Sequence, residues 1–262
     1  MKNTTKFLNL IFSAFLAVSI SFLISSCGEK VEIRRIPDLE NMMVGCQAGT
    51  TGETFLRENL KSAKAKPFRD GYEACLALKN DEIDAVILDE FPAMALAKAN
   101  KDLKIIDLNL PAEEYAVAVK KGNTELLQMI NRAIRILRLD GSLKKLREAY
   151  FPADGNIKIP QSPGAKYAKT WKMGTNAAFP PFEYIDETEV VGFDISFAEM
   201  IADKSRRNLH VFDVSFASLL DALNAGSVDF VCAGMTVNEE RKTQMDFSEP
   251  YFTSRQVIIV RK

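Results

Sequence analysis

The chain has 262 residues, a formal net charge of −1 and a single histidine, His210. The near-neutral charge excludes the basic footprint of a nucleic-acid-binding protein, and one histidine supports neither a catalytic triad nor a histidine metal site. We therefore predict no metal, no cofactor and no nucleic-acid partner, and a structural role for His210. The length suits one large domain or two small ones.

The first 26 residues predict a lipoprotein signal peptide. A basic start, MKNTTK, precedes an apolar run that ends in ISSC at residues 24–27. ISSC resembles a bacterial lipobox, which implies that Cys27 is lipidated and becomes the mature N-terminus. The alternative is an N-terminal membrane helix, for which Ser-Ser-Cys-Gly is a poor exit. We predict secretion across the cytoplasmic membrane and lipid anchoring to a membrane, in the periplasm or at the cell surface.

Residues 42–151 alternate short apolar strands with helices. The predicted strands are MMVGC, KPF, DAVILDE, KIIDL and YAVAV, and the predicted helices are ETFLRENLKSA, YEACLALKN, PAMALAKAN, TELLQMINRAIRILRL and SLKKLREAY. In the longest helix, one face carries Leu126, Ile130, Ile134 and Leu137. This alternation predicts an α/β fold with a largely parallel sheet.

Residues 152–168, with three prolines and two glycines, have the composition of a linker. A second α/β half follows. It contains the strand WKMGTN, a hairpin within FEYIDETEVVGFDI, the helix ISFAEMIADKSRR, the strand LHVFDV, the helix FASLLDALNAG, and the strands VDFVCAGM and QVIIV. We expect two lobes with a ligand between them, at the carboxyl ends of the strands. Cys46, Cys75 and Cys232 lie in apolar contexts and are predicted to be buried free thiols.

The turn GCQAGTTGE, residues 45–53, joins a predicted strand to a helix. It lacks the lysine of a Walker phosphate loop, so a carboxylate fits it better than a triphosphate. Unpaired N–H groups and the helix dipole make such a turn an anion site. Thr51 or Gly52 is the expected N-cap. The alternative is an ordinary capped strand–helix turn.

Two charged residues follow strand ends, one in each half. Arg241, in EERK, offers the planar fork that binds a carboxylate. Asp89 ends the apolar strand AVILD, where a carboxylate suits an ammonium group. Together they make a clamp for a zwitterion. Each has another interpretation: Arg241 as a solvated surface residue, and Asp89 as the N-cap of the next helix.

A set of motifs resembles the extracellular solute-binding proteins that deliver polar amino acids to bacterial ABC importers. The motifs are TNAAFPPFEY, VGFDI, FASLLDAL, VDFVCAGMTVNEERKTQMDFSEPYF, VGCQAGTTGE, IDAVILDE and DGSLKKLREAYF. The resemblance implies a two-lobed α/β fold of the type II periplasmic-binding-protein kind, with no enzymatic activity. It also implies two partners, a free polar amino acid and the permease subunits of an ABC transporter.

The order of these motifs differs from that of the family, in which the FPPFEY lobe precedes the GTTGE lobe. The chain therefore looks like a circular permutant. Its segments would be a signal peptide (1–26), a tether and start of the hinge (27–41), lobe II (42–113), a closing strand and helices packing on lobe I (114–151), a linker (152–168) and lobe I (169–262).

The permutation raises the question of how the lobes are joined. Only the segment near residues 108–118 would connect them covalently, unless VEIRR, within residues 31–36, pairs with QVIIV. We predict that pairing, because two exposed apolar strand edges would otherwise remain. A monomer is expected, and a dimer that exchanges lobes is the alternative arrangement.

The resemblance also implies which residues bind the ligand. Its carboxylate would be held from opposite lobes, by Thr51, Gly52 and Arg241. Its α-ammonium would be held by Asp89, by Ala233 or Gly234, and by Thr236. The ligand side chain would be flanked by Phe179 and Phe216, in a pocket that includes Asn176 and Gln47.

The neutral side chain of Asn176 bears on the identity of the ligand. Family members that take basic amino acids often carry an acid there, whereas an amide pairs best with an amide or a hydroxyl. We therefore predict a neutral polar ligand such as glutamine. A cationic ligand such as arginine or lysine is the alternative, because Glu183 or Glu90 could bind its side chain.

Two other functions fit the same fold, a dehydratase-like enzyme and an amino-acid sensor module. The clamp formed by Asp89 and Arg241 is complete, and an aspartate that binds an ammonium group holds the ligand rather than reacting with it. This argues for a binding protein.

Overall fold

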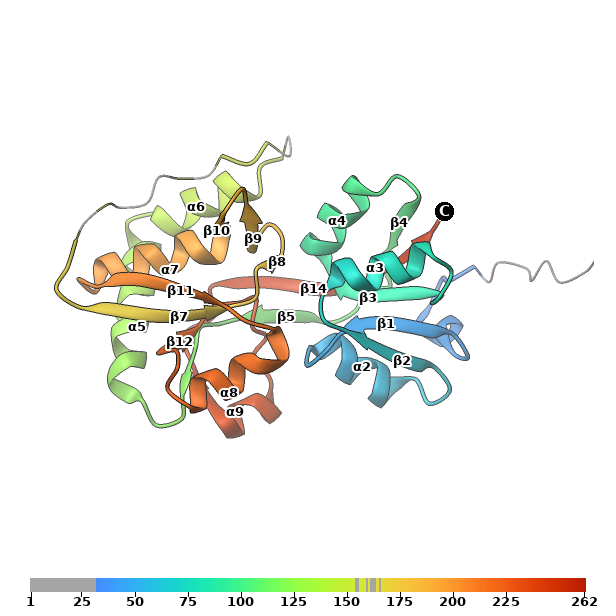
Figure 1. Ribbon diagram of the computed structural model, residues 1–262, viewed down its shortest axis with the longest axis horizontal. Helices are drawn as coiled ribbons and strands as arrows, with labels where there is room; N and C mark the ends of the chain where they lie inside the picture. Colours follow the sequence, from blue (N-terminus) through green and yellow to red (C-terminus); the bar gives the residue numbers. More distant parts are fainter. Residues whose placement is uncertain (1–31, 154–155, 159, 161–163, 165) are drawn as a thin grey trace, which may run out of the picture. The chain divides into compact units, whose positions relative to one another are not determined.

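The computed structural model describes residues 32–153, 156–158, 160, 164 and 166–262. Cys27 and the predicted signal peptide lie outside the described residues. Residues 34–262 form one compact unit, which contains two large sheets with their helices (Figure 1). Among the described residues, no helix is both long and apolar enough to cross a bilayer.

The first sheet, called here the β1 sheet, has the strand order β2-β1-β3-β14-β4. After the short helix η1 (Ile36–Leu39), its elements are β1 (Met43–Gln47), α2 (Thr51–Asn59), β2 (Lys64–Phe68), α3 (Gly71–Lys79), β3 (Ala85–Asp89), α4 (Glu90–Ala99), β4 (Leu103–Ile106) and β14 (Phe252–Arg261). β1 runs parallel to β2 and β3, whereas β14 is antiparallel to β3 and β4. Every residue of β3 is buried, as expected of a central strand covered on both faces.

The second sheet, called here the β7 sheet, has the order β11-β7-β12-β6-β13. Its strands are β6 (Ala118–Lys120), β7 (Thr170–Thr175), β11 (Asn208–Asp213), β12 (Phe230–Val231) and β13 (Met245–Phe247). Its helices are α5 (Thr124–Leu139), α6 (Ser142–Tyr150), α7 (Phe193–Lys204), η2 (Phe216–Ser218), α8 (Leu219–Asn224) and α9 (Glu239–Gln244). A small sheet contains the predicted hairpin, with strands β8 (Ala178–Phe179), β9 (Glu183–Asp186) and β10 (Glu189–Val191).

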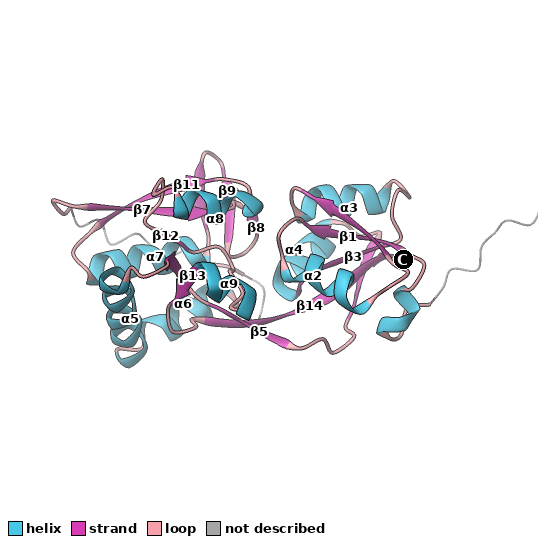
Figure 2. Ribbon diagram, turned by 90° about the horizontal axis from the view of Figure 1, so that it is seen from below, coloured by secondary structure: helices cyan, strands magenta, loops and turns pink. Residues whose placement is uncertain are grey.

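Two antiparallel strands connect the sheets. The first half of β14 pairs with β5 (Ala112–Tyr115), and its second half lies between β3 and β4 in the β1 sheet. Figure 2 shows β14 and β5 running side by side between the two sheets. The chain therefore crosses twice, once in each strand.

These crossings differ from the predicted arrangement in two ways. β14 itself is the second covalent connection, and its edges are occupied by β3, β4 and β5 rather than by residues 31–36. Residues 32–35, the described part of VEIRR, form no strand. In addition, the end of the predicted lobe I, from Gln256 onward, belongs to the β1 sheet. A strand with both edges paired leaves no place for a further partner.

YAVAV also differs from its prediction as one strand. β5 ends at Tyr115, and β6 begins at Ala118. The backbone must leave β14 at this point and enter between β12 and β13, where β6 pairs on both sides. The break in the strand follows from the change of sheet.

Several predictions about burial can be compared with the structure. In α5, the face with Leu126, Ile130, Ile134 and Leu137 is buried, which confirms the prediction. α5 and α6 pack against α7. The free thiols of Cys46, Cys75 and Cys232 are buried, also as predicted. His210 lies exposed on β11 beside the ring of Phe212, 4.6 Å between centroids.

An aromatic cluster that includes Phe252 of β14 joins the two halves of the unit. Phe91, from α4, lies edge-on to Phe252 on β14 and to Phe151 after α6, with ring centroids 5.4 Å and 4.8 Å apart. Phe182 packs against both Phe151 and Phe252. These contacts contribute apolar packing in the place where the two sheets are connected.

Candidate functional site

The predicted binding residues follow the carboxyl ends of strands from both sheets. Gln47 and Asp89 are the last residues of β1 and β3. Asn176 directly follows β7, and Ala233 lies two residues after β12. Parallel strands bring their carboxyl ends to one edge, so each sheet presents its candidates along a single edge.

Asp89 is buried at the end of β3, next to the start of α4. It occupies the N-cap position, but its side chain makes no capping hydrogen bond. Instead, the Tyr115 hydroxyl donates to its Oδ1 over 2.5 Å. Burial, and after it the charge of Glu113, raises the pKa of Asp89 to about 7. The carboxyl group is thus held at the edge of the sheet rather than used to begin the helix.

Arg241 lies in α9, whose N-cap residue Asn238 accepts a hydrogen bond from the Arg241 amide. Its guanidinium donates to the carbonyl oxygens of Thr236, at 2.7 Å, and Gly49, at 2.9 Å. It also lies over the ring of Phe216, 5.5 Å from the centroid. Burial lowers the pKa of Arg241. Arg241 is half-buried, and its contact with Gly49 joins the two halves of the site.

Glu113 is a member of this cluster that sequence reasoning missed. Its Oε2 accepts hydrogen bonds from the hydroxyls of Thr51, at 2.8 Å, and Thr236, at 2.6 Å. Thr51 and Thr236 were both predicted as ligand contacts, one from each half. The adjacent acids Glu113 and Glu114 are indistinguishable by residue type. Only the register of β5 against β14 decides which one faces the site.

Gln47 and Asn176 form a direct contact across the site. The Gln47 amide nitrogen donates to Asn176 Oδ1 over 2.8 Å, and also to the Arg69 carbonyl oxygen at 3.3 Å. Both side chains are buried. The two predicted pocket amides are thus paired with each other.

Gly234 brings backbone close to an aromatic ring. Its φ is +52°, and a Cβ at this position would lie 2.7 Å from Cε1 of Phe179. Its amide donates to Asp194 Oδ2 over 2.8 Å. Ala233, directly before it, is buried. The turn therefore requires glycine, and it packs against one of the two predicted aromatic residues.

The start of α2 differs in one detail from its prediction. Thr51 is the first residue of the helix, so Thr50 rather than Thr51 or Gly52 is the N-cap, and its side chain makes no capping hydrogen bond. Thr51 and Gly52 lie in the first turn, where N–H groups have no acceptor inside a helix. The Thr51 hydroxyl is engaged by Glu113.

The two acids considered for a cationic ligand have other partners. Glu90 accepts from Arg255 at 3.1 Å. Glu183 is 1% exposed, and the nearby Asp194 is 0% exposed. Burial, and then the charge of Asp194, raises the pKa of Glu183 well above its ordinary value. Neither acid is placed as a free receptor for a cation.

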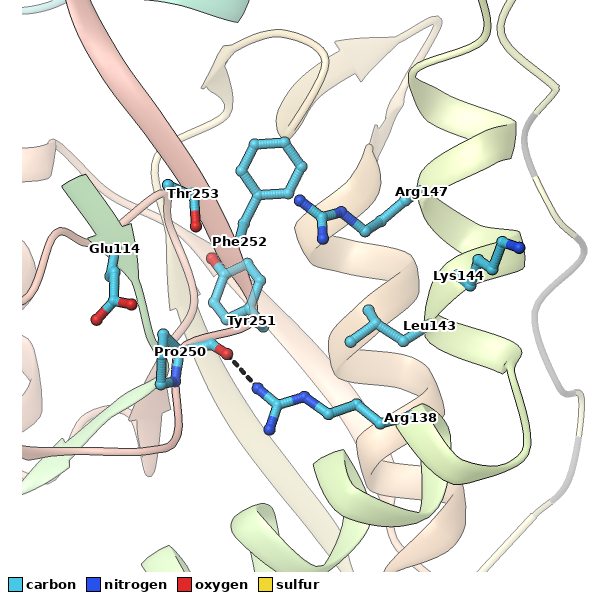
Figure 3. Close-up of a pocket in the computed structure, with 9 residues that line it drawn as sticks. All are labelled: Glu114, Arg138, Leu143, Lys144, Arg147, Pro250, Tyr251, Phe252 and Thr253. Carbon is cyan, nitrogen blue, oxygen red and sulfur yellow. Dashed lines mark hydrogen bonds between the residues drawn. The ribbon is translucent and has the colours of Figure 1, made fainter. Parts of the chain in front are cut away.

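Two concavities are relevant to the location of the site. One, of about 210 Å³, is lined from both halves, by Gly49, Thr54 and Arg57 on one side and by Phe216, Asn238 and Arg241 among the residues on the other. A larger one, of about 380 Å³, contains none of the predicted residues. Figure 3 shows Arg147 of α6 directed at Phe252 of β14 in this larger cavity, and Arg138 of α5 hydrogen-bonded to the Pro250 carbonyl oxygen. We associate the candidate site with the smaller concavity, because it reaches Arg241 and Phe216.

The described residues contain no group of three or more histidine, cysteine or acidic side chains that could hold a metal ion. The chemistry available is that of hydrogen bonding and charge. One arginine, one buried aspartate, two hydroxyls and backbone groups suit a small molecule that carries both signs of charge.

Residues 171–262 match the family of bacterial extracellular solute-binding proteins, family 3. The resemblance predicted from the motifs is confirmed over this segment, which begins within β7 and extends to the end of the chain. The family is one of binding proteins, in agreement with the prediction that the chain is not an enzyme. The family match and the two α/β sheets also agree with the predicted fold, that of type II periplasmic binding proteins.

Named relatives are also similar to this chain over only part of its length. The arginine-binding extracellular protein ArtP of Bacillus subtilis (strain 168) is 43% identical over 90 residues, which are 34% of this chain and 35% of ArtP. A probable histidine-binding protein of Neisseria gonorrhoeae is 37% identical over 109 residues, 41% of each chain. The L-cystine-binding protein TcyJ of Escherichia coli (strain K12) is 33% identical over 128 residues, 48% of each chain. The chain thus spans about a third to a half of these relatives.

Among solved structures, an ancestral arginine-binding protein bound to glutamine is 45% identical to this chain. The match covers 33% of this chain and 39% of that protein, with a TM-score of 0.32.

Proposed function

We propose that the protein binds a free polar L-amino acid between its two halves and delivers it to the permease of an ABC importer. The observation that carries this proposal is that an acid and an arginine lie on opposite sides of the site. Asp89 is held at the end of β3, and Arg241 reaches from α9 to the Gly49 carbonyl on the other side. An amino acid supplies an ammonium for the first and a carboxylate for the second.

Closure around the ligand follows from the distribution of these groups. Thr51 and Asp89 belong to α2 and β3, beside the β1 sheet, whereas Thr236 and Arg241 lie in the segment from β12 to α9, beside the β7 sheet. Contacts such as that of Gln47 with Asn176 now join the two sides of the site. A ligand enters when these contacts separate, and it is fully coordinated when they close again.

The side-chain pocket favours a neutral polar ligand, with glutamine as the first candidate. Asn176 and Gln47 offer amide groups and no charge, while Glu90 is paired with Arg255. The names of the relatives favour arginine as a second candidate. Asn176→Asp is expected to shift the preference towards arginine by about tenfold or more, because it adds a negative charge inside the pocket.

The predicted lipid anchor at Cys27 and the circular permutation are part of this proposal. A lipidated N-terminus would keep the receptor beside its permease, outside the cytoplasm. The exchange of β6 and β14 between the sheets supports a single closed unit, and hence a monomer, despite the altered order of segments.

A thermal-shift screen of residues 28–262 against the twenty amino acids tests the function. A ligand that binds only the folded state raises the melting temperature. We expect a shift with glutamine or another polar amino acid, and loss of that shift in Arg241→Ala. Absence of any shift would refute amino-acid binding and return attention to other small molecules.

A further inference from the structure

Glu113 lies inside the candidate site without an assigned role. The hydroxyls of Thr51 and Thr236 both donate to its Oε2. Two donors from different elements fix the direction of a flexible side chain more firmly than one. Neither of these hydrogen bonds uses Oε1.

The register of the crossing strands places Glu113 on the same face as Asp89. Glu113 is opposite Ser254 of β14, and Asp89 is opposite Gln256. Ser254 and Gln256 are two apart on β14 and so share a face of that strand, and their partners Glu113 and Asp89 lie on the same face. Glu114, opposite Thr253, has the other face and lines the larger cavity in Figure 3.

The face that carries Asp89 and Glu113 has more acidic than basic groups. The charged and titratable groups that act on Asp89 and Arg241 include Glu113, Tyr115 and Glu240. The Arg241 guanidinium donates to two carbonyl oxygens rather than to either carboxyl group. Glu113 is thus a second acid beside Asp89, and it raises the pKa of Asp89. An ammonium group, with three donors and no acceptor, fits this environment.

We propose that Glu113 is a second receptor for the α-ammonium of the ligand, beside Asp89, held in place by Thr51 and Thr236. This inference rests on the proposed function. It narrows the ligand class to amino acids with a free α-amino group, because an Nα-acetyl group removes the charge and two of the three donors. Peptide-like or acylated ligands would leave both carboxyl groups without a cation.

Isothermal titration of the purified protein with L-glutamine and L-arginine tests this role, with Glu114→Gln as the matched control on the opposite face of β5. Glu113→Gln is expected to weaken binding about 10- to 100-fold, the range for a hydrogen bond to a charged group. Glu114→Gln should stay within twofold of the wild type. The Nα-acetyl derivatives should not bind the wild type.

Proton release provides a readout that a merely structural role would not change. At pH 7 the ligand ammonium should drive a proton from Asp89, visible as a dependence of the binding enthalpy on the buffer. In Glu113→Gln this release should shrink, because the neighbouring charge is gone. Glu113→Asp, which keeps the charge on a shorter side chain, should bind with intermediate affinity and retain the release.

The outcomes separate the two proposals. If the wild type binds neither these nor any other amino acid, the proposed function fails and this inference with it. If the wild type binds but Glu113→Gln binds equally well, Glu113 is not a receptor. Tighter binding by Glu113→Gln would also overturn the inference, and would mean that Glu113 competes with the ligand carboxylate for Thr51.

Discussion

The two large sheets share one plan. In each, three parallel strands are followed by an antiparallel strand from the other half of the chain and then by a fourth strand of its own half. β14 is the exchanged strand in the β1 sheet, and β6 has that place in the β7 sheet. The exchange joins the sheets, so neither is complete without residues from the other half.

The sheets differ in what their third parallel strand presents. β3 ends in Asp89, a carboxyl group that faces the site. β12 is followed by Ala233 and Gly234, which present backbone, while Asp194 lies behind them and accepts from the Gly234 amide. One scaffold thus supplies a charge directly on one side. On the other side a buried acid, Asp194, supports the backbone. We therefore expect Asp89 to matter mainly for ligand binding and the Gly234 side mainly for stability.

Asp89→Asn should have the largest effect on ligand binding. The change removes the charge and places an amide donor where the ligand ammonium donates, so we expect a loss of about 100-fold or more, in the range for removing one partner of a buried ion pair. Titration calorimetry measures the loss. An affinity within threefold of the wild type would exclude Asp89 as the ammonium contact.

The same variant should keep or gain stability. The folded pKa of Asp89, about 7, lies above its ordinary value. The folded wild type therefore binds more protons than the unfolded chain between about pH 4 and 7, and loses stability as the pH rises through this range. Asp89→Asn lacks this loss, which urea unfolding at pH 5 and pH 8 would reveal.

Gly234→Ala tests the backbone side of the comparison. The new methyl group would meet Phe179 at 2.7 Å, at a φ of +52°. We expect the free energy of unfolding to fall by about 2–5 kcal/mol from overpacking and the left-handed conformation together. Gly226→Ala is the matched control, since its φ is +73° and nothing lies within 4 Å. It should cost about 1–2 kcal/mol. Equal losses in the two variants would show that Phe179 moves away freely.

The acid behind Gly234 is one of a buried pair. Both oxygens of Glu183, and Oδ1 of Asp194, have no hydrogen-bond partner among the described residues when both groups are treated as carboxylates. Asp194 Oδ2 accepts from the Gly234 amide and from the Tyr251 hydroxyl, at 2.8 Å and 2.6 Å. A proton on Glu183 would let it donate to Asp194. Burial raises the pKa of both groups, that of Asp194 to about 6.

Glu183→Gln should flatten the pH dependence of stability. Because both folded pKa values lie above the ordinary ones, the wild type loses stability as the pH rises from about 4. The glutamine amide donates to Asp194 without titrating, so the loss between pH 5 and pH 8 should shrink by about 1 kcal/mol or more. Urea unfolding across this range measures it, with the exposed Glu189→Gln as control. A slope unchanged in Glu183→Gln would contradict the pair, and ligand affinity should change little.

The local elements were largely predictable from the sequence, because apolar periodicity and turn residues determine them locally. α5, with its buried face, is the clearest case. The exchange of strands was not predictable. QVIIV reads as a buried strand whichever sheet receives it, and YAVAV gives no sign that Ala116 and Val117 separate two strands.

The candidate site was predicted from motifs rather than from chemistry alone. The structure brings Asp89, Thr51, Thr236 and Arg241 together through Tyr115, Glu113 and Gly49. Tyr115 and Glu113 are on a crossing strand, where no motif marks them and only the register against β14 determines their direction. Residues whose role depends on long-range pairing are the ones that sequence patterns miss.

The smallest effect that we expect is the loss of stability on removing the hydrogen bond between Gln47 and Asn176, which joins the edges of the two sheets. Gln47 and Asn176 are 129 positions apart and hydrogen-bond at 2.8 Å. A double-mutant cycle with Gln47→Ala and Asn176→Ala should give a coupling of about 0.5–1.5 kcal/mol in unfolding experiments. The cycle cancels the separate contact of Gln47 with the Arg69 carbonyl. Coupling near zero without ligand, but within this range with it, would mean that the edges meet only in the bound protein. Coupling absent under both conditions would contradict the contact itself.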